Sequence, residues 1–227
     1  GEKNVQYNST LKGRNGFPYI LKKKFFDKPK FGTLNLHAGP LPYYKGGSPL
    51  NWQIINGEKK IGLSVIKINQ NIDDGDLLSQ KFFTLKKNYD IKKVHSITNN
   101  IFPKILYESI IKIIKKKKPF IKKNKKKSKY LNQRKEKDGL IDWDRLNQVK
   151  VYNLVRAITK PYPGAFTYNS KGDKIIIYKC SLSKKKLSGL SNGQVFKDKN
   201  KYLIKTMQGA ILLKTFTHKL KNLEILK

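Results

Sequence analysis

A lysine-rich stretch divides this chain into two parts, and it limits the fold more than any other feature of the sequence. Residues 115–137 hold 13 basic side chains and 1 acidic side chain, and they begin with four consecutive lysines followed by Pro119. A segment with so much like charge and so little apolar surface is typical of a solvated linker. We therefore predict a first domain over residues 1–114, a linker over 115–137 and a second domain over 138–227.

The composition excludes several classes of protein. With 227 residues, of which 38% are hydrophobic, the chain can bury a sizeable core. A single cysteine, Cys180, rules out a disulfide framework and a thiolate zinc cluster, and it favours a reducing compartment. No apolar run reaches the roughly 18–20 residues of a membrane-spanning helix, and residues 1–10 are too polar for a signal peptide. We expect a cytoplasmic protein without a membrane span.

The net charge of +35 favours partners that carry phosphate, because closely spaced lysines attract the phosphates of a nucleic acid regardless of its base sequence. Only four of the 50 basic residues are arginine, however, and surfaces that read phosphate use arginine for bidentate contacts. The abundance of Lys, Asn and Ile is also what biased codon usage would produce. A non-catalytic, basic RNA-binding module remains one alternative interpretation of this chain.

Before the linker, apolar runs typical of strands alternate with helical patterns, which favours an α/β fold. A short helix is predicted between Pro49, at its first turn, and Gly57, after its end. A long helix is predicted after Asp90, and we expect Pro103 to kink or divide it. Strands are predicted over residues 16–21, 32–36, 61–68 and 77–85.

After the linker, an apolar stripe predicts a helix over residues 147–158, which the prolines at 161 and 163 end. Five short strands within about 55 residues favour a small antiparallel barrel or sandwich. These strands are predicted over residues 165–168, 174–179, 194–196, 202–205 and 210–216.

Three polar residues of the first half form a candidate catalytic set. Asn35 and His37 lie two apart on a predicted strand, so their side chains share a face. Asp73 lies in the next polar loop, and a parallel sheet would bring it to the same strand end. An amide and an imidazole can stabilise negative charge on an attacked carbonyl, while a carboxylate orients the imidazole or accepts a proton. Because no strong nucleophile is present, direct acyl transfer to an amine suits the set better than a covalent intermediate. A merely structural Asn-x-His pair is the alternative.

Three stretches around these residues carry a longer pattern: LNLHAGPLPYYKGG over residues 34–47, SPLNW over 48–52 and IDDGD over 72–76. The pattern resembles that of the enzymes that transfer a formyl group from 10-formyltetrahydrofolate to an amine. In that family a strand ends in Asn-x-His, a Leu-Pro-x-x-(Arg/Lys)-Gly loop follows, and an Asp-x-Gly-Asp loop comes later. The resemblance covers residues 16–217. It implies a Rossmann-like formyltransferase domain followed by a barrel-like β domain.

The resemblance also implies roles for individual residues. Asn35, His37 and Asp73 match the catalytic trio, Asp74 is a neighbour without that role, and Asp76 fixes the loop. The implied formyl donor is 10-formyltetrahydrofolate, with no metal. The residues implied to help line its pterin pocket through backbone contacts are Leu41, Pro42, Gln70, Asn71, Ile72 and Gly75.

The second half carries IDW over residues 141–143 and KPYPGAF over 160–166. These stretches resemble the C-terminal domain of methionyl-tRNA formyltransferases and of nucleotide-amino-sugar formyltransferases. The Pro-Tyr-Pro sequence and Asn51-Trp52 are more similar to amino-sugar enzymes of the aminoarabinose type. We therefore predict a nucleotide-linked amino sugar as the acceptor. Initiator methionyl-tRNA, which the basic linker would suit, is the alternative.

The family places several strand and helix units before the Asn-x-His strand, whereas 34 residues precede Asn35 here. We therefore expect the chain to lack an N-terminal part of the catalytic domain. That part would contribute central strands of the sheet and portions of the folate and acceptor sites.

Overall fold

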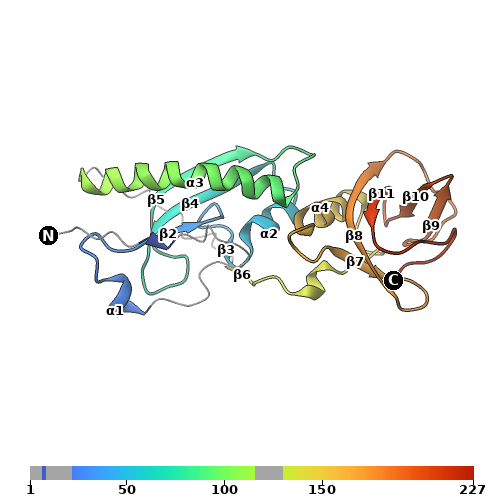
Figure 1. Cartoon of the computed structure of the whole chain (residues 1–227), viewed down its shortest axis with the longest axis horizontal. Helices are drawn as coiled ribbons and strands as arrows, with labels where there is room; N and C mark the ends of the chain where they lie inside the picture. Colours follow the sequence, from blue (N-terminus) through green and yellow to red (C-terminus); the bar gives the residue numbers. More distant parts are fainter. Residues whose placement is uncertain (1–6, 9–21, 116–129) are drawn as a thin grey trace. The chain divides into compact units, whose positions relative to one another are not determined.

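The structure of the chain is a computed structural model, which describes residues 7–8, 22–115 and 130–227 (Figure 1). Contacts divide the chain into two units. Unit 1 consists of Gly1–Gln53, Lys59–Lys86 and Lys93–Gln133, and unit 2 consists of Ile54–Glu58, Lys87–Lys92 and Arg134–Lys227. Unit 2 thus includes two short segments from the first half of the sequence. The strand predicted over 16–21 and residues 116–129 of the predicted linker lie outside the described residues.

Unit 1 contains a four-stranded sheet with the strand order β1-β2-β4-β5. Strand β2 pairs with β1 in parallel and with β4 antiparallel, and β4 and β5 form an antiparallel hairpin. The sheet confirms the strands predicted over 32–36, 61–68 and 77–85. Its strands are β1 (Tyr7–Asn8), β2 (Leu34–His37), β4 (Lys60–Lys67) and β5 (Asp76–Thr84).

The parallel arrangement expected around Asp73 is wrong, because β4 runs against β2. In their pairing His37 lies opposite Ser64, and Leu34 lies opposite Lys67. The connection between the two strands contains the predicted short helix, α2 (Pro49–Ile55). Seven residues of helix rise only about 10 Å, so the chain re-enters the sheet at the end where β2 leaves it. This short return produces the antiparallel pair.

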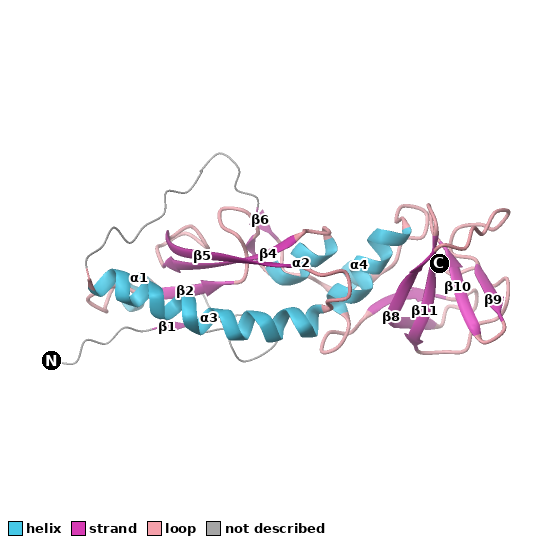
Figure 2. Cartoon of the chain, turned by 90° about the horizontal axis from the view of Figure 1, so that it is seen from above, coloured by secondary structure: helices cyan, strands magenta, loops and turns pink. Residues whose placement is uncertain are grey.

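Helix α3 (Ile91–Ile114) is a single element of 24 residues that contains Pro103, so the predicted division at that proline does not occur. The buried Ser109 hydroxyl of α3 donates to Ser79 Oγ on β5 at 2.9 Å, which joins the helix to the sheet. Figure 2 shows α3 running lengthwise beside these strands. The buried side chains of β4 therefore belong to a core that α3 covers on one side.

Two shorter elements of unit 1 frame the loops described below. Helix α1 (Lys23–Phe26) is joined to the start of β2, because the Thr33 hydroxyl donates to the Phe26 carbonyl at 3.0 Å. Strand β3 (Lys45–Gly46) pairs in parallel with β6 (Tyr130–Leu131), which lies within the lysine-rich stretch.

Unit 2 contains a five-stranded antiparallel sheet with the strand order β7-β8-β11-β10-β9. Helix α4 (Gln148–Ile158) packs against β8, and the Asn147 side chain caps the helix by accepting from the Lys150 N–H at 2.9 Å. A short 3-10 helix, η2 (Glu136–Gly139), precedes α4. The strands are β7 (Ala165–Tyr168), β8 (Lys174–Ser183), β9 (Val195–Asp198), β10 (Lys201–Lys205) and β11 (Ala210–Phe216).

The last residues of the chain connect the two edges of this sheet. Lys227 exchanges two backbone hydrogen bonds with Tyr168 of the edge strand β7. Val195 of the opposite edge strand β9 donates to the Glu224 carbonyl and accepts from the Leu223 N–H. Residues 223–227 thus cover both edges, which gives the domain the barrel-like character predicted from its sequence.

Across the parts of the chain that the structure describes, no helix combines the length and the apolar character needed to cross a bilayer.

Candidate active site

Strand β2 places the first two residues of the predicted trio. Asn35 lies between Asn8 of β1 and Ile66 of β4 in the sheet register. His37 is the last residue of the strand and is only 5% exposed. Because the two residues are separated by one position, their side chains leave the same face of the sheet. The structure therefore agrees with the predicted placement of this pair.

The structure also brings Asp73 to His37. Asp73 Oδ1 lies 3.4 Å from His37 Nδ1, and Asp73 Oδ2 accepts a hydrogen bond from the Gly46 N–H at 2.8 Å. The loop that carries Asp73 begins beside Leu34, at the opposite end of β2, since Lys67 pairs with Leu34. The loop must therefore fold back along the strand to reach His37. The sequence motif predicted this meeting correctly, although the reason given for it, a parallel sheet, was wrong.

The second nitrogen of the His37 ring is also engaged. His37 Nε2 lies 2.7 Å from the Tyr44 carbonyl oxygen. A carbonyl can only accept, so Nε2 carries the hydrogen in this contact, while Nδ1 faces a carboxylate. Both ring nitrogens can donate to these acceptors when the imidazole is protonated. In this structure the Nε2 hydrogen is therefore directed at the Tyr44 carbonyl.

Glycine at position 39 makes this packing possible. A Cβ on Gly39 would lie 2.8 Å from His37 Nε2 and 2.8 Å from the Tyr44 carbonyl oxygen. Any side chain there would push apart the two atoms that form the hydrogen bond. The glycine of the predicted loop is thus needed for close approach.

Polar side chains from β4, β5 and α2 hold the loop that follows β2. Ser64 Oγ donates to the Gly39 carbonyl at 2.7 Å and accepts from the Leu41 N–H at 3.1 Å. Gln80 Nε2 donates to the Leu41 carbonyl at 2.8 Å. Gln53, which is fully buried, donates to the Ala38 carbonyl at 2.8 Å and accepts from the Gly62 N–H at 2.7 Å. Sequence reasoning missed these three residues, because single polar residues in a strand or helix have no distinctive pattern.

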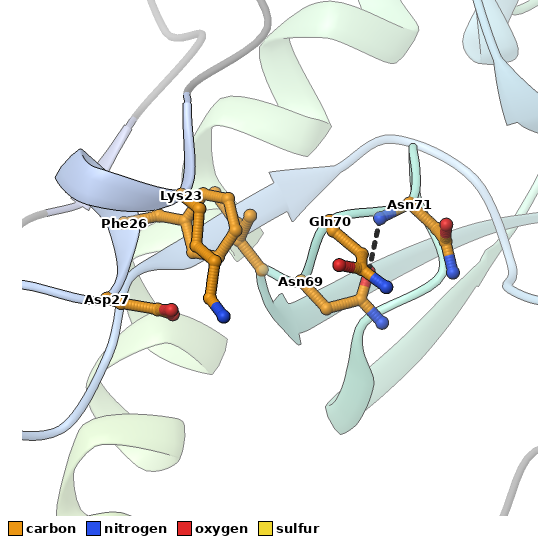
Figure 3. A pocket seen from close by; sticks show the side chains of 7 residues that line it. Lys23, Phe26, Asp27, Asn69, Gln70 and Asn71 are labelled. Atoms are coloured by element: carbon orange, nitrogen blue, oxygen red, sulfur yellow. Dashed lines mark hydrogen bonds between the residues drawn. The ribbon is translucent and has the colours of Figure 1, made fainter.

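A pocket of about 240 Å³ lies beside the Asp73 loop (Figure 3). One wall comes from α1 and the residue after it, and the other comes from the start of the loop between β4 and β5. Within the loop, the Asn71 N–H donates to Asn69 Oδ1 at 3.0 Å. The lining residues are Lys23, Phe26, Asp27, Ile68, Asn69, Gln70 and Asn71.

The residues implied to contact the pterin occupy different surroundings. Gln70 and Asn71 line the pocket, whereas Leu41 packs into a core cluster with Ile66 and Leu77. Pro42 is also buried, and Ile72 is 47% exposed. Gly75 fits tightly, since a Cβ there would lie 1.7 Å from the Lys67 carbonyl oxygen. The sequence did not predict the contribution of α1 to this pocket, because four residues of helix carry no clear periodicity.

Comparison with known proteins gives this geometry a family. The formyl transferase family model matches residues 10–110, and the model of the formyl transferase C-terminal domain matches residues 134–224. The chain belongs to the formyl transferase family. Family membership confirms the resemblance drawn from the Asn-x-His and Asp-x-Gly-Asp stretches.

Curated relatives come from two kinds of protein. The bifunctional polymyxin resistance protein ArnA of Wigglesworthia glossinidia brevipalpis is 40% identical over 192 residues, which are 79% of this chain and 28% of that protein. The methionyl-tRNA formyltransferase of Citrifermentans bemidjiense is 34% identical over 152 residues, which are 67% of this chain and 47% of that protein. The matched part of the chain thus spans less than half the length of either relative.

Solved structures show the same fold. The methionyl-tRNA formyltransferase from Clostridium thermocellum matches with a TM-score of 0.59 and 25% identity, over 75% of this chain and 71% of that one. An N-formyltransferase from Helicobacter canadensis, in complex with folinic acid and dTDP-3-aminofucose, matches with a TM-score of 0.65 and 21% identity, over 89% of this chain and 72% of that one. Relatives with either type of acceptor therefore share the fold of this chain.

Proposed function

We propose that the protein transfers a formyl group from 10-formyltetrahydrofolate to a primary amine, and that the amine belongs to a nucleotide-linked amino sugar. The observation that carries the proposal is the contact of the buried His37 with Asp73 on the face of β2 that also presents Asn35. Membership in the formyl transferase family supports the reaction.

The lining of the pocket beside the Asp73 loop supports binding of the folate donor there. A pterin is a flat ring system that needs apolar contact on its faces and hydrogen-bonding groups at its edge. Phe26 and Ile68 provide apolar surface, and Asn69, Gln70 and Asn71 provide amides. When bound, 10-formyltetrahydrofolate supplies the formyl carbon that the acceptor amine attacks.

The residues of the chain then have distinct tasks. The Asn35 amide and the His37 Nε2 proton donate to the carbonyl oxygen on which negative charge grows. To donate to the substrate oxygen, His37 Nε2 must give up its hydrogen bond to the Tyr44 carbonyl. Tyr44 has a left-handed backbone conformation, with a φ angle of 57°. Asp73 holds the ring through Nδ1 and assists removal of the proton from the amine.

Two observations favour the amino sugar as acceptor. The stretches around Asn51-Trp52 and Pro161–Pro163 resemble those of amino-sugar enzymes, and the similar N-formyltransferase from Helicobacter canadensis was solved in complex with dTDP-3-aminofucose. Initiator methionyl-tRNA is the second candidate, because residues 115–137 carry 13 basic side chains that could contact RNA phosphates. The proposed compartment is the cytoplasm, which suits the free thiol of Cys180.

The test is a formyl-transfer assay of the native full-length protein with 10-formyltetrahydrofolate and either a nucleotide-linked amino sugar or charged initiator tRNA. His37→Asn and Asp73→Asn should each lower kcat/KM by about 10²–10³-fold, the range of a lost general acid–base or oxyanion-stabilising group. His218→Asn, which changes an exposed histidine in unit 2, should leave activity unchanged. Turnover with charged tRNA alone would refute the sugar acceptor.

Full activity of both His37→Asn and Asp73→Asn would refute the proposed site. The non-catalytic alternative makes a different prediction. It requires RNA binding that weakens steeply with salt, without folate binding, in a protein that His37→Asn does not affect.

A further inference from the structure

The loop that carries Asp73 depends on contacts from outside the loop. Asp73 has φ 49°, a left-handed conformation that is unfavourable for a residue with a Cβ. Its carboxylate must nevertheless stay beside His37, because both proposed tasks of Asp73 depend on the 3.4 Å separation from His37 Nδ1. The groups that hold this loop therefore affect the proposed chemistry without touching a substrate.

Two consecutive residues of β3 hold two consecutive carboxylates of the loop. The Gly46 N–H donates to Asp73 Oδ2 at 2.8 Å, and Lys45 Nζ donates to Asp74 Oδ1 at 2.5 Å. The Lys45 side chain is 11% exposed, whereas Asp74 is 43% exposed. An ion pair with one largely buried member is less screened by water and salt than a surface pair. The Lys45–Asp74 pair thus fixes the residue next to Asp73.

The β3 side of this contact is itself anchored. The Gly47 N–H donates to the Leu131 carbonyl at 2.9 Å, and the Trp52 indole N–H donates to the Asn132 carbonyl at 3.1 Å. A Cβ on Gly46 would lie 2.2 Å from the Leu131 carbonyl oxygen, which shows how closely β6 backs β3. Lys45 and Gly46 therefore extend from a segment with little room to move.

We propose that Lys45 and Asp74 are positioning residues that keep the Asp73 carboxylate on the Gly46 N–H and against His37. This inference rests on the proposed function for the role of Asp73. It assigns a task to Asp74, which the sequence pattern treated as a neighbour without one. Loss of either charge should let the loop move and weaken the hydrogen bond between Asp73 and Gly46.

Hydrogen exchange of the Gly46 amide tests the proposal directly. Asp74→Asn and Lys45→Met should each speed this exchange about tenfold, and the double variant should exchange no faster than either single variant, as expected for two residues that act through one contact. Lys45→Arg, which keeps the charge, should restore slow exchange. If Lys45→Met fails to fold, Asp74→Asn carries the test, because it keeps the shape of a partly exposed side chain.

The matched control is Asp198→Asn. Asp198 pairs with Lys185 at 2.8 Å on the surface of unit 2, so the substitution makes the same change of charge away from the site. It should leave Gly46 exchange unchanged. The proposal is overturned if Asp74→Asn does not change the exchange of Gly46, or if Asp198→Asn changes it equally.

Kinetics of the native full-length protein separate this proposal from the proposed function. Asp74→Asn should lower kcat about tenfold and leave KM unchanged. This loss is smaller than the roughly 10²-fold loss of rate that a 1 Å misplacement of a catalytic group can cause. If His37→Asn abolishes transfer but Asp74→Asn keeps full kcat, the positioning role is refuted and the proposed function stands. If His37→Asn and Asp73→Asn both keep full activity, the proposed function fails, while Gly46 exchange still decides whether Lys45 and Asp74 hold the loop.

Discussion

Replacing Ser64 by alanine would test whether one hydroxyl group holds the loop after the Asn-x-His strand. Ser64 is fully buried on β4, and its Oγ donates to the Gly39 carbonyl at 2.7 Å and accepts from the Leu41 N–H and from Gln80 Nε2, each at 3.1 Å. Both backbone groups belong to buried residues, so alanine would leave two buried polar groups without these partners. Each such group costs about 1–3 kcal/mol. We therefore expect Ser64→Ala to lower the free energy of unfolding by about 3 kcal/mol.

A second serine of the same sheet is the control. Ser79 on β5 is also buried, but among the described residues its hydroxyl shares only one hydrogen bond, with Ser109 Oγ at 2.9 Å. Ser79→Ala should therefore cost about 1 kcal/mol, the net value of one hydrogen bond.

Urea unfolding, followed by circular dichroism, measures both variants. With a slope of about 2 kcal/mol per molar urea, the midpoints should fall by about 1.5 M for Ser64→Ala and about 0.5 M for Ser79→Ala. Equal shifts would refute the reasoning, since they would mean that the extra bonds of Ser64 to the loop add no stability. A change in the slope would show instead that the unfolding reaction itself had changed.

The remaining predictions concern Gly75 in the loop that carries Asp73, and Gly189 and Cys180 in unit 2. Gly75→Ala places a Cβ 1.7 Å from the Lys67 carbonyl oxygen, so it should destabilise the protein by about 2–3 kcal/mol, the upper range for overpacking. Gly189 has open space around it but a left-handed backbone with φ 79°, so Gly189→Ala should lower the free energy of unfolding by about 1 kcal/mol. If the urea midpoints of the two variants fell equally, the steric argument would be contradicted. Burial raises the pKa of the Cys180 thiol from 9.0 to about 12. At pH 8 the Cys180 thiol of the native protein should therefore react with a disulfide reagent about 10³-fold more slowly than the thiol of the protein unfolded in urea. The reaction rate of the native protein should rise about tenfold per pH unit. A native rate within tenfold of the unfolded rate would disprove this.

Local patterns in the sequence predicted most of the individual elements. Strand β7 (Ala165–Tyr168) occurs at its predicted residues, because Pro163-Gly164 and the turn at Gly172 bound it on both sides. The proline at the first turn and the glycine after the end likewise predicted α2 (Pro49–Ile55). Such signals depend only on neighbouring residues, so a single sequence contains them.

The directions and partners of the strands were harder to predict, because they depend on residues far apart in the chain. The alternation of strands and helices indicated parallel neighbours, whereas the short α2 returns the chain to the same sheet end and produces an antiparallel pair. Strand β6 (Tyr130–Leu131) lies within the predicted linker, yet it pairs with β3. Two residues are too few to show the alternation that reveals a strand.

The candidate site shows the same division. The motif placed His37 and Asp73 together, and the structure has them at 3.4 Å. The residues that hold them there were not apparent, because Ser64, Gln80 and Lys45 become neighbours of the site only after β4, β5 and β3 have packed. Chemistry-bearing residues can thus be found by pattern, whereas the residues that support them require coordinates.

The make-up of unit 2 has a consequence for building hybrid proteins. The Tyr152 hydroxyl of α4 donates to the Lys87 carbonyl at 2.7 Å, and Arg156 Nη1 donates to the Tyr89 carbonyl at 2.9 Å. Both acceptors lie in Lys87–Lys92, a segment well before the lysine-rich stretch. In a chimera joined within the lysine-rich stretch, the segment that faces α4 would come from the other protein, so Tyr152 and Arg156 would lose these two acceptors. Grafting the C-terminal domain onto another member of the formyl transferase family should succeed best when this segment and Ile54–Glu58 are transplanted with it.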